Sequence, residues 1–267
     1  MATHRFTEIP ADALSIIETL AGPVLKAVTV STGLNSEIAA RIYNHADDIV
    51  FVKGMRVDHP RVWTQEREAV INPHVRPLAP AMLWRVQHGG WDLLCFEEID
   101  GPHATYAPGS PHLDLVAEAM QTLAGLPTPD LPLKTMPDRM RSYTDDADLF
   151  AGDRLLHTDW NPHNVLIADG RARLVDWAWA ARGAAWVDPA LWVIWLIASG
   201  HTPEQAERLA AERTTLADAP VPSLDAFAHA QNRMWDEIAG DAPDEWTAAM
   251  QTAAAAWHRH RSGRLTS

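Results

Sequence analysis

The sequence predicts an α+β protein with an N-terminal antiparallel sheet and a larger, mostly helical part after it. Before residue 100, apolar runs of strand length alternate with turn-forming segments, and beyond residue 112 the apolar positions recur at helical spacing. Between these patterns, residues 97–102 end in Gly101-Pro102, and a glycine-proline step interrupts strands and helices alike. We therefore predict two lobes, residues 1–100 and 101–267, with a hinge at about 97–102.

A helix and five antiparallel strands are expected early in the N-terminal lobe. Apolar residues at helical spacing predict a helix over 12–22, which Gly22-Pro23 would end. Turn-rich segments separate the first three strand-like runs, and His88-Gly89-Gly90 joins the last two as a hairpin. Pro60 is suited to a first helical turn and opens a second helix that extends to about residue 72. The expected strands cover residues 27–31, 37–43, 49–53, 82–87 and 91–97.

Helices dominate the expected C-terminal lobe. The first begins near residue 113 and ends at Gly125, and residues 138–150 are expected to be helical although their pattern is weak. Prolines mark the starts of several later helices, because proline is accommodated in the first turn. The later helices are expected over 189–199, 203–217, 223–240 and 243–260.

Composition and charge narrow the function classes. The 267 residues are 47% hydrophobic and 21% charged, which is ordinary for a globular protein. The net charge of −13 argues against a nucleic-acid partner, because phosphate backbones require a basic surface. No apolar run in the sequence is long enough to span a bilayer and no signal-peptide pattern begins it, so we expect a cytoplasmic protein with no membrane partner. The single cysteine, Cys95, lies in an apolar run and is expected to be a buried thiol.

The densest group of polar side chains lies in residues 154–179, which read as a loop, a strand, a turn and a strand. Asp169-Gly170 is a dipeptide that favours a tight hairpin turn, and Asp176 ends the second strand. We expect this hairpin to bring Asp176 back beside Asp159 and Asn164. Two carboxylates and an amide form a hard-oxygen site that suits magnesium. The polar residues of the loop are His157, Asp159, Asn161, His163 and Asn164.

Two features of the N-terminal lobe have more than one interpretation. Lys53 ends the otherwise apolar run Ile49-Val50-Phe51-Val52, and a buried ammonium needs an anion, which Glu66 or Glu68 of the following helix would supply. Alternatively, Lys53 extends into water and both glutamates are surface residues. The turn at 32–36 would lay backbone N–H groups against a phosphate, or it is an ordinary hairpin loop.

The order of these features resembles the aminoglycoside phosphotransferase and choline kinase-like family, relatives of protein kinases, over nearly the whole chain. The most specific part is HTDWNPHN at 157–164, which matches the family's His-x-Asp-x-x-x-x-Asn catalytic loop. Val175-Asp176-Trp177 follows at the spacing of the family's magnesium-binding aspartate. The resemblance implies a bilobal protein-kinase-like fold, with a nucleotide-binding N-terminal lobe and a catalytic, acceptor-binding C-terminal lobe. The chain departs from protein kinases in its single-glycine nucleotide loop and in Trp177-Ala178, where protein kinases have Phe-Gly.

The resemblance also implies roles for single residues. Asp159 would be the catalytic base, Asn164 and Asp176 would hold Mg²⁺, and Lys53 would bind the nucleotide phosphates. Glu68, with Glu66 as the alternative, would hold Lys53. His157 would be a framework residue of the loop, and Asp188 resembles a structural aspartate of the second lobe. Nucleotide contacts are further implied for the loop residues Ser31, Thr32, Gly33, Asn35 and Ser36 and for the hinge residues Glu97 and Ile99.

Residues that would meet an acceptor are harder to identify. Several of the twelve tryptophans lie close to the motif in sequence, where they would stack on a ligand, or they are core residues. Acidic residues near 236–245 would bind a cationic acceptor, or they are solvated helix faces and first turns. The candidate acceptor-binding residues are Trp160, His163, Trp179, Asp236 and Glu237.

The leading hypothesis is a phosphotransferase that uses ATP (or GTP) and Mg²⁺ to phosphorylate a hydroxyl of a small molecule, as a monomer or homodimer. The acceptor would be cationic or aromatic, and an antibiotic inactivated by O-phosphorylation is favoured. Within the same chemistry, the acceptor would instead be a metabolite such as choline, homoserine or a sugar. From another class, His157, Asp159, His163 and Asp176 would bind zinc or iron in a hydrolase, which leaves Lys53 and the sheet without a role.

Overall fold

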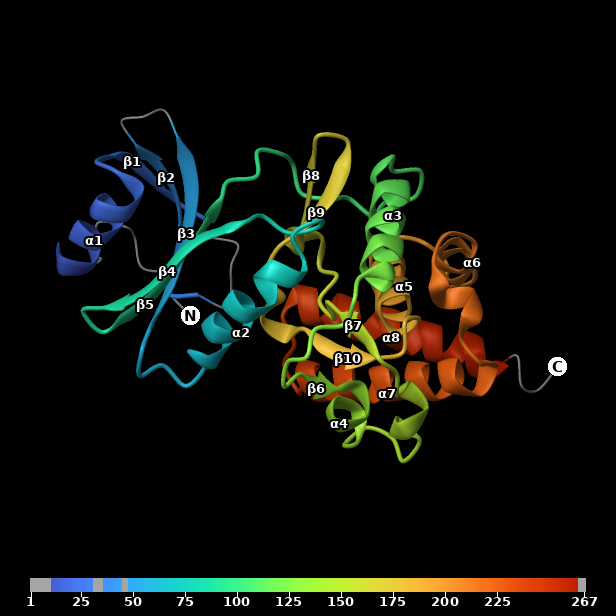
Figure 1. Cartoon of the computed structure of the whole chain (residues 1–267). Coiled ribbons are helices and arrows are strands. Elements are labelled where there is room, and N and C mark those ends of the chain that lie inside the picture. Colours follow the sequence, from blue (N-terminus) through green and yellow to red (C-terminus); the bar gives the residue numbers. More distant parts are fainter. Residues whose placement is uncertain (1–10, 31–35, 45–47, 264–267) are drawn as a thin grey trace. The chain divides into compact units, whose positions relative to one another are not determined.

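The structure is a computed structural model that describes residues 11–30, 36–44 and 48–263 (Figure 1). The chain divides into two compact units. The first unit comprises Met1–Gly101 and the short segment Leu174–Ala178, and the second comprises Pro102–Arg173 and Trp179–Ser267. The segment that carries Asp176 therefore belongs to the first unit, although it lies far along the sequence.

The first unit is built on the predicted five-stranded antiparallel sheet, which is confirmed. Its strand order is β1-β2-β3-β5-β4, so β3 lies at the centre between two hairpins. All neighbouring strands pair antiparallel. The strands are β1 (Val24–Thr29), β2 (Ile38–Asn44), β3 (Ile49–Arg56), β4 (Met82–His88) and β5 (Trp91–Glu97).

Each face of the sheet is covered by one helix, as Figure 1 shows for α1 (Ala11–Ala21) and α2 (Trp63–Ile71). Val52 of β3 lies in the same buried cluster as Ile17 of α1. Phe51, one residue away, packs instead with the cluster that contains Ala69 of α2. Because successive side chains of a strand point to opposite faces, Lys53 also points to the α2 face.

The second unit is mostly helical, as predicted, and carries two small sheets. The strands β6, β10 and β7 form a three-stranded sheet, and β8 and β9 form a hairpin. In the hairpin turn Asp169 and Gly170 both have positive φ, +50° and +68°, as a two-residue turn of this kind requires. The strands are β6 (Lys134–Thr135), β7 (Arg154–Leu156), β8 (Val165–Ala168), β9 (Arg171–Leu174, whose last residue belongs to the first unit) and β10 (Ala181–Gly183).

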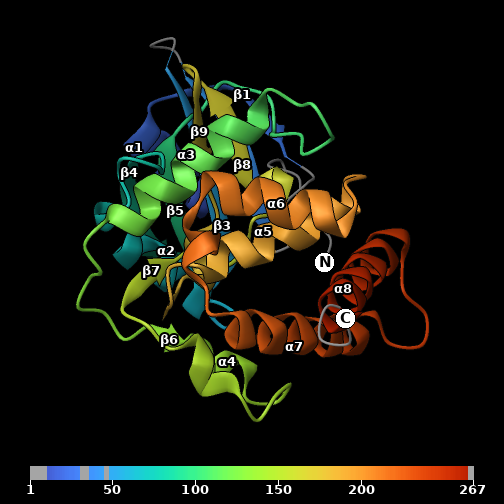
Figure 2. The ribbon, with the colours of Figure 1, turned by 90° about the vertical axis from the view of Figure 1, so that its right-hand side faces the viewer.

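The helices of the second unit pack against one another (Figure 2), and buried apolar side chains form the core between them. Phe227 of α7 stacks edge-to-face on Trp257 of α8, and Trp235 of α7 stacks on Trp246 near the start of α8, so these helices run in opposite directions. Trp192 of α5 is fully buried. The helices are α3 (His112–Gly125), α4 (Met136–Met140), α5 (Val187–Ala198), α6 (Pro203–Arg213), α7 (Val221–Ala239) and α8 (Glu245–Gly263).

Two predicted helices of this unit are shorter than expected. The region 138–150 contains only α4 and the 3-10 helix Ala147–Phe150, because α4 begins early, where the Thr135 hydroxyl caps it by accepting the Asp138 N–H. The helix expected over 203–217 ends at Arg213, where Thr214 is extended and its hydroxyl accepts the Leu216 N–H of a following 3-10 turn. Competition from threonine side chains thus ends or starts a helix where apolar periodicity does not.

Two further expectations concern membrane-spanning helices and the single cysteine. Among the helices of the described residues, none is long and apolar enough to cross a membrane. Cys95 is buried on β5, and burial raises the pKa of its thiol to about 12. The thiol is therefore protonated at neutral pH, as expected for a buried structural cysteine.

Candidate active site

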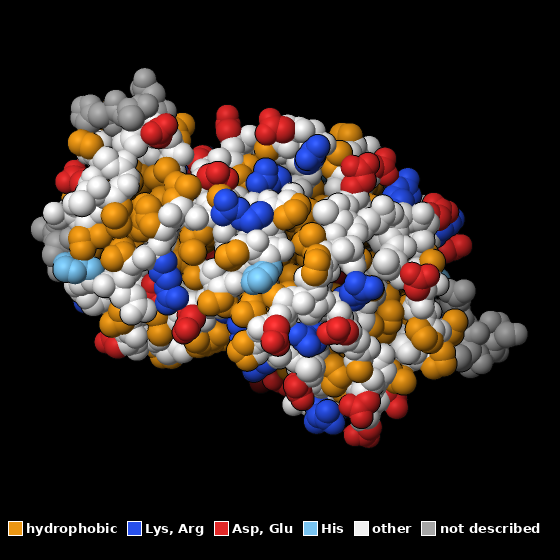
Figure 3. Space-filling model, in the orientation of Figure 1, with side chains coloured by type: hydrophobic (Ala, Val, Ile, Leu, Met, Phe, Trp, Pro, Cys, Tyr) orange, Lys and Arg blue, Asp and Glu red, His pale blue; other side chains and the backbone are white. Residues whose placement is uncertain are grey.

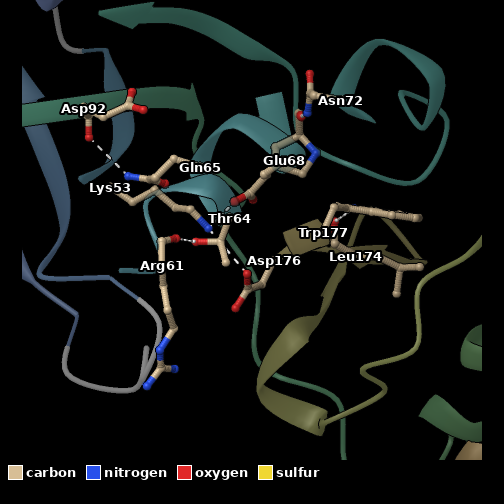
Figure 4. Close-up of polar contacts among 11 residues, drawn as sticks. Lys53, Arg61, Thr64, Gln65, Glu68, Asn72, Asp92, Leu174, Asp176 and Trp177 are labelled. Carbon is tan, nitrogen blue, oxygen red and sulfur yellow. Dashed lines mark hydrogen bonds and ion pairs between the residues drawn. The ribbon is translucent and has the colours of Figure 1, made fainter. Parts of the chain in front are cut away.

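Lys53 is the centre of a buried polar cluster in the first unit (Figure 4). In the sheet it lies between Ala39 of β2 and Leu94 of β5, and only 8% of the residue is exposed. Its Nζ forms an ion pair with Glu68 of α2 and lies 3.5 Å from Oδ1 of Asp176. Burying an ammonium is costly unless anions compensate it, so the two carboxylates explain how the sheet accommodates a lysine here.

Opposing effects determine the charge of Lys53. Burial lowers the pKa of the ammonium, but the charges of Glu68 and then Asp176, together with hydrogen bonds to both, raise the pKa to about 12. Burial raises the pKa of Glu68, and the charge of Lys53 opposes that rise. The ammonium is therefore fully charged at neutral pH.

The register of α2 selects Glu68 as the partner of Lys53. Glu68 is buried, with 4% exposed, whereas Glu66 is exposed to solvent. Residues two apart on a helix do not share a face, so only one of the two glutamates can meet the sheet. Gln65 fixes the helix on the sheet because its Nε2 donates to the carbonyl oxygen of Asp92 at 3.2 Å.

Asp176 reaches the ammonium from the segment that returns to the first unit. The Leu174 N–H donates to the carbonyl oxygen of Leu78 at 2.8 Å, and Trp177 Nε1 donates to the carbonyl oxygen of Leu174 at 3.1 Å. Asp176 itself has a φ of +62°. A non-glycine residue in this left-handed region is uncommon, and such conformations cluster at functional sites.

The other predicted nucleotide contacts are only partly described. Glu97 ends β5, where its backbone N–H donates to the carbonyl oxygen of Ala81 at 2.9 Å and its carboxylate accepts the Ala81 N–H at 3.0 Å. Ile99 is 8% exposed and Ser36 is 7% exposed, so both are buried. Four predicted loop residues, Ser31, Thr32, Gly33 and Asn35, lie outside the described residues.

In the second unit, the HTDWNPHN stretch leaves β7 as a loop that Asp188 holds by its backbone. The His157 N–H donates to Asp188 Oδ2 at 2.8 Å, and the Thr158 N–H donates to Oδ1 at 2.9 Å. Asp188 lies in the first turn of α5 and is 3% exposed. Burial raises the pKa of Asp188, and the backbone hydrogen bond from His157 opposes this rise. Both carboxylate oxygens are thus used to position the start of the loop.

Asp159 comes next in this loop and is half-buried. Its N–H donates to His157 Nδ1 at 3.2 Å, and its Oδ1 accepts the Asn161 N–H at 3.4 Å. Asn164 Nδ2 lies 3.4 Å from the Asp159 carbonyl oxygen. His157 is fully buried, so the structure gives it a supporting position under the loop.

Arg139, which no sequence pattern indicates as a site residue, lies beside this loop. Its Nη1 donates to Thr158 Oγ1 at 2.6 Å and to the carbonyl oxygen of Trp179 at 2.8 Å. Residue 139 lies in a weakly patterned segment, and no spacing rule connects it to Thr158 or Trp179. Only the pairing of β6 and β7 with β10 brings these residues together.

Two predicted acceptor residues near the motif have different surroundings. Trp160 is fully buried, with its ring 5.8 Å from the His157 ring between centroids, and its carbonyl oxygen accepts the Tyr106 hydroxyl at 3.0 Å. A fully buried ring has no face left for a ligand, so we assign Trp160 to the core and not to acceptor contact. His163 is exposed, and its ring meets the His103 ring edge-on at 5.1 Å.

The predicted acidic acceptor residues lie on the exposed side of α7. Asp236 accepts from Asn232 at 3.2 Å and from Gln251 at 3.0 Å, and Glu237 accepts the Tyr143 hydroxyl at 3.3 Å. On the face shown in Figure 3, acidic side chains of the second unit are interspersed with basic ones. These neighbours favour the solvated-surface interpretation of Asp236 and Glu237 over a dedicated cation site.

The geometry of the described residues does not support the hydrolase alternative. Within residues 11–30, 36–44 and 48–263, no group of three or more His, Cys, Asp or Glu side chains is arranged to hold a metal ion. Zinc or iron would need His157 as a ligand, yet its Nδ1 accepts the Asp159 N–H and its ring is buried.

Comparison with known proteins identifies the fold. No family model matches the chain, and no curated sequence matches it. Among solved structures, choline kinase LicA from Streptococcus pneumoniae superposes with a TM-score of 0.67 at 15% identity, over 93% of this chain and 98% of that chain. Aminoglycoside phosphotransferase APH(4)-Ia, in a ternary complex with AMP-PNP and hygromycin B, gives a TM-score of 0.62 at 18% identity, over 94% and 98%.

An aminoglycoside phosphotransferase from Alicyclobacillus acidocaldarius gives a TM-score of 0.59 at 12% identity, over 97% of this chain and 96% of that chain. These structural neighbours are small-molecule phosphotransferases, and the match extends over nearly the full length of each chain. The chain therefore has the protein-kinase-like fold of these phosphotransferases, which is the fold that its sequence predicted.

Proposed function

We propose that this protein is a phosphotransferase that moves the γ-phosphate of ATP (or GTP) to a hydroxyl group of a small molecule. The observation that carries the proposal is the buried ion-pair cluster of Lys53, Glu68 and Asp176 in a kinase-like sheet. A charged ammonium held in place between two carboxylates is a poor device for stability alone, because desolvation offsets much of the attraction. It is well suited to bind the α- and β-phosphates of a nucleotide.

The donor chemistry of Asn164 and Asp176 fits magnesium. Asp176 offers a carboxylate, and Asn164, whose Nδ2 points to the Asp159 carbonyl, keeps its amide oxygen for a cation. Magnesium is usually bound by one or two carboxylates together with substrate phosphates, so Asn164 and Asp176 are the residues that would hold it. When bound, the metal would neutralise charge on the phosphates.

Asp159 is our candidate for the catalytic base, and the hydrogen bonds around it support this role. Its backbone is held through His157 and Asn164, and the residue before it is held by Asp188. The carboxylate would accept the proton of the acceptor hydroxyl as the new oxygen–phosphorus bond forms. The bond between the γ-phosphorus and the β,γ-bridging oxygen would break, and the nucleoside diphosphate would leave.

The base of the nucleotide would meet the end of β5. Glu97 and Ile99 would offer backbone groups there, and Ser36 would lie near the phosphates. Glu98 supports this segment because its carboxylate pairs with Arg41 of β2 at 2.5 Å. We expect the protein to act in the cytoplasm, where nucleoside triphosphates are available.

We favour an antibiotic with an accessible hydroxyl as the acceptor, because one structural neighbour was solved with hygromycin B. The second candidate is a metabolite of the choline type, because another neighbour is a choline kinase. Near the motif, His163 is exposed and Trp179 is half-buried, and these two residues would contact the acceptor. Asp236 and Glu237 would contribute only if their present hydrogen bonds were exchanged.

An acceptor panel tests the proposal. With γ-labelled ATP or GTP and Mg²⁺, we expect label transfer to at least one member of a set that spans aminoglycoside, peptide, macrolide and nucleoside antibiotics, choline, homoserine and sugars. Lower susceptibility of a sensitive bacterium that expresses the chain would identify the antibiotic class. Tight stoichiometric zinc in the purified protein, with no thermal shift on adding nucleotide and Mg²⁺, would contradict the proposal and favour the hydrolase.

Asp176→Asn is expected to remove the magnesium dependence of nucleotide binding. Wild-type protein should bind ATP more tightly with Mg²⁺ than in EDTA, because the metal links the carboxylate to the phosphates. The variant should bind ATP with the same affinity in both conditions, as measured by isothermal titration calorimetry. Asp169→Asn, in an exposed turn where asparagine tolerates the same positive φ, is the matched control. An unchanged magnesium effect in Asp176→Asn would rule out the metal role.

A further inference from the structure

Thr158, the residue before the proposed base, has an unusual backbone conformation. Its φ is +67°, in the left-handed region that β-branched residues rarely adopt. Such a conformation persists only where the surrounding structure holds it. Because Thr158 immediately precedes Asp159, its backbone dihedrals set the direction in which the Asp159 side chain leaves the chain.

Three hydrogen bonds hold Thr158 from two sides. Asp188 accepts its N–H at 2.9 Å, and the Trp179 carbonyl oxygen accepts its hydroxyl at 2.8 Å. The Thr158 hydroxyl in turn accepts from Arg139 Nη1 at 2.6 Å. The same Nη1 donates to the Trp179 carbonyl oxygen at 2.8 Å, so guanidinium, hydroxyl and carbonyl form a closed triangle.

Strand pairing places Arg139 at this triangle. It lies on α4, which begins directly after β6, and β6 pairs with β10 in parallel. On its other side β10 pairs with β7, the strand that runs into His157. The guanidinium also lies over the Trp179 ring, 5.9 Å from its centroid. Asp159 and Asp188 are the carboxylates whose charges act on it.

We infer that Arg139 is a positioning residue for the Asp159 carboxylate, acting through the hydroxyl of Thr158 and the carbonyl of Trp179. This inference rests on the proposed function, since it assigns Arg139 a role in that same reaction. Arg139 holds Thr158 in its left-handed conformation and keeps the Asp159 carboxylate aimed at the acceptor hydroxyl. A small misplacement of a catalytic group lowers the rate of the chemical step more than it lowers ground-state binding.

The test compares variants that remove the triangle with variants that keep it. Arg139→Met and Thr158→Val should each lower kcat about 10- to 100-fold and leave the KM for nucleotide within about twofold. Thr158→Ser keeps the hydroxyl and should retain wild-type kcat, and Arg139→Lys should recover part of the loss. In the double variant Arg139→Met/Thr158→Val, kcat should fall no further than in the less active of the two single variants, because the two residues act as one unit.

Arg182→Met is the matched control, because it also removes a guanidinium near this loop. Arg182 lies on β10, and its Nη2 donates to the Pro129 carbonyl oxygen at 3.0 Å. It should leave kcat unchanged. Wild-type kcat in Arg139→Met, or losses that simply multiply in the double variant, would overturn the inference while leaving the proposed function intact. Should Arg139→Met not fold, equal kcat in Thr158→Val and Thr158→Ser overturns it in the same way. A wild-type protein that transfers phosphate to no acceptor overturns both.

Discussion

Replacing Asp159 by Asn is expected to lower kcat for phosphoryl transfer by about 10²- to 10⁴-fold, the usual contribution of a general base. The amide has nearly the shape of the carboxylate and keeps an oxygen to accept the Asn161 N–H. It cannot take the proton of the acceptor hydroxyl. Nucleotide affinity should stay within about twofold, because Lys53 and Asp176 are untouched. Labelled-nucleotide transfer and calorimetric binding measure the two quantities separately.

The same substitution elsewhere controls for a general effect of lost negative charge. Asp153→Asn removes an exposed carboxylate whose partner is Arg182 at 3.3 Å, in the segment that leads into β7. It should retain wild-type kcat and nucleotide affinity. Full turnover by Asp159→Asn would exclude Asp159 as the base, whereas lost nucleotide binding in that variant would indicate that the substitution damages the fold of the loop.

Replacing Lys53 by Met is expected to reduce both stability and nucleotide affinity. Methionine leaves Glu68 buried without its cation, and breaking a buried pair in this way typically costs about 3–5 kcal/mol of unfolding free energy. The lost ammonium should also weaken ATP binding by at least about tenfold, because charge-assisted hydrogen bonds to phosphate are lost. Urea unfolding and calorimetry measure the two effects.

A double variant separates the two roles of Lys53. In Lys53→Met/Glu68→Gln no buried charge remains at that pair, so most of the lost stability should return. Nucleotide affinity should remain low, because the phosphate-binding cation is still absent. Glu66→Gln, on the exposed side of the same helix, controls for the change to α2. If the double variant regained nucleotide affinity together with stability, Lys53 would be a structural residue only.

Local sequence signals were sufficient for most of the fold. Apolar runs of strand length, separated by turn-forming segments, specify the five strands of the first unit. The Asp169-Gly170 turn specifies the β8–β9 hairpin. The kinase-like fold was expected because HTDWNPHN and the following Asp176 resemble the catalytic loop and the magnesium-binding aspartate of a known family. The limits of α4 and α6 escaped prediction because threonine side chains there compete for backbone groups.

The sequence by itself determined the α+β fold class, most of the strands and helices, and the candidate residues for the reaction. Tertiary structure alone decided that Glu68 meets Lys53, that Trp160 is core, and that Arg139 joins the loop at Thr158. The physical reason is that periodicity reports which side of an element is buried but not which distant element covers it. Partners such as Arg139 and Thr158 become neighbours only when strands far apart in the chain pair in register.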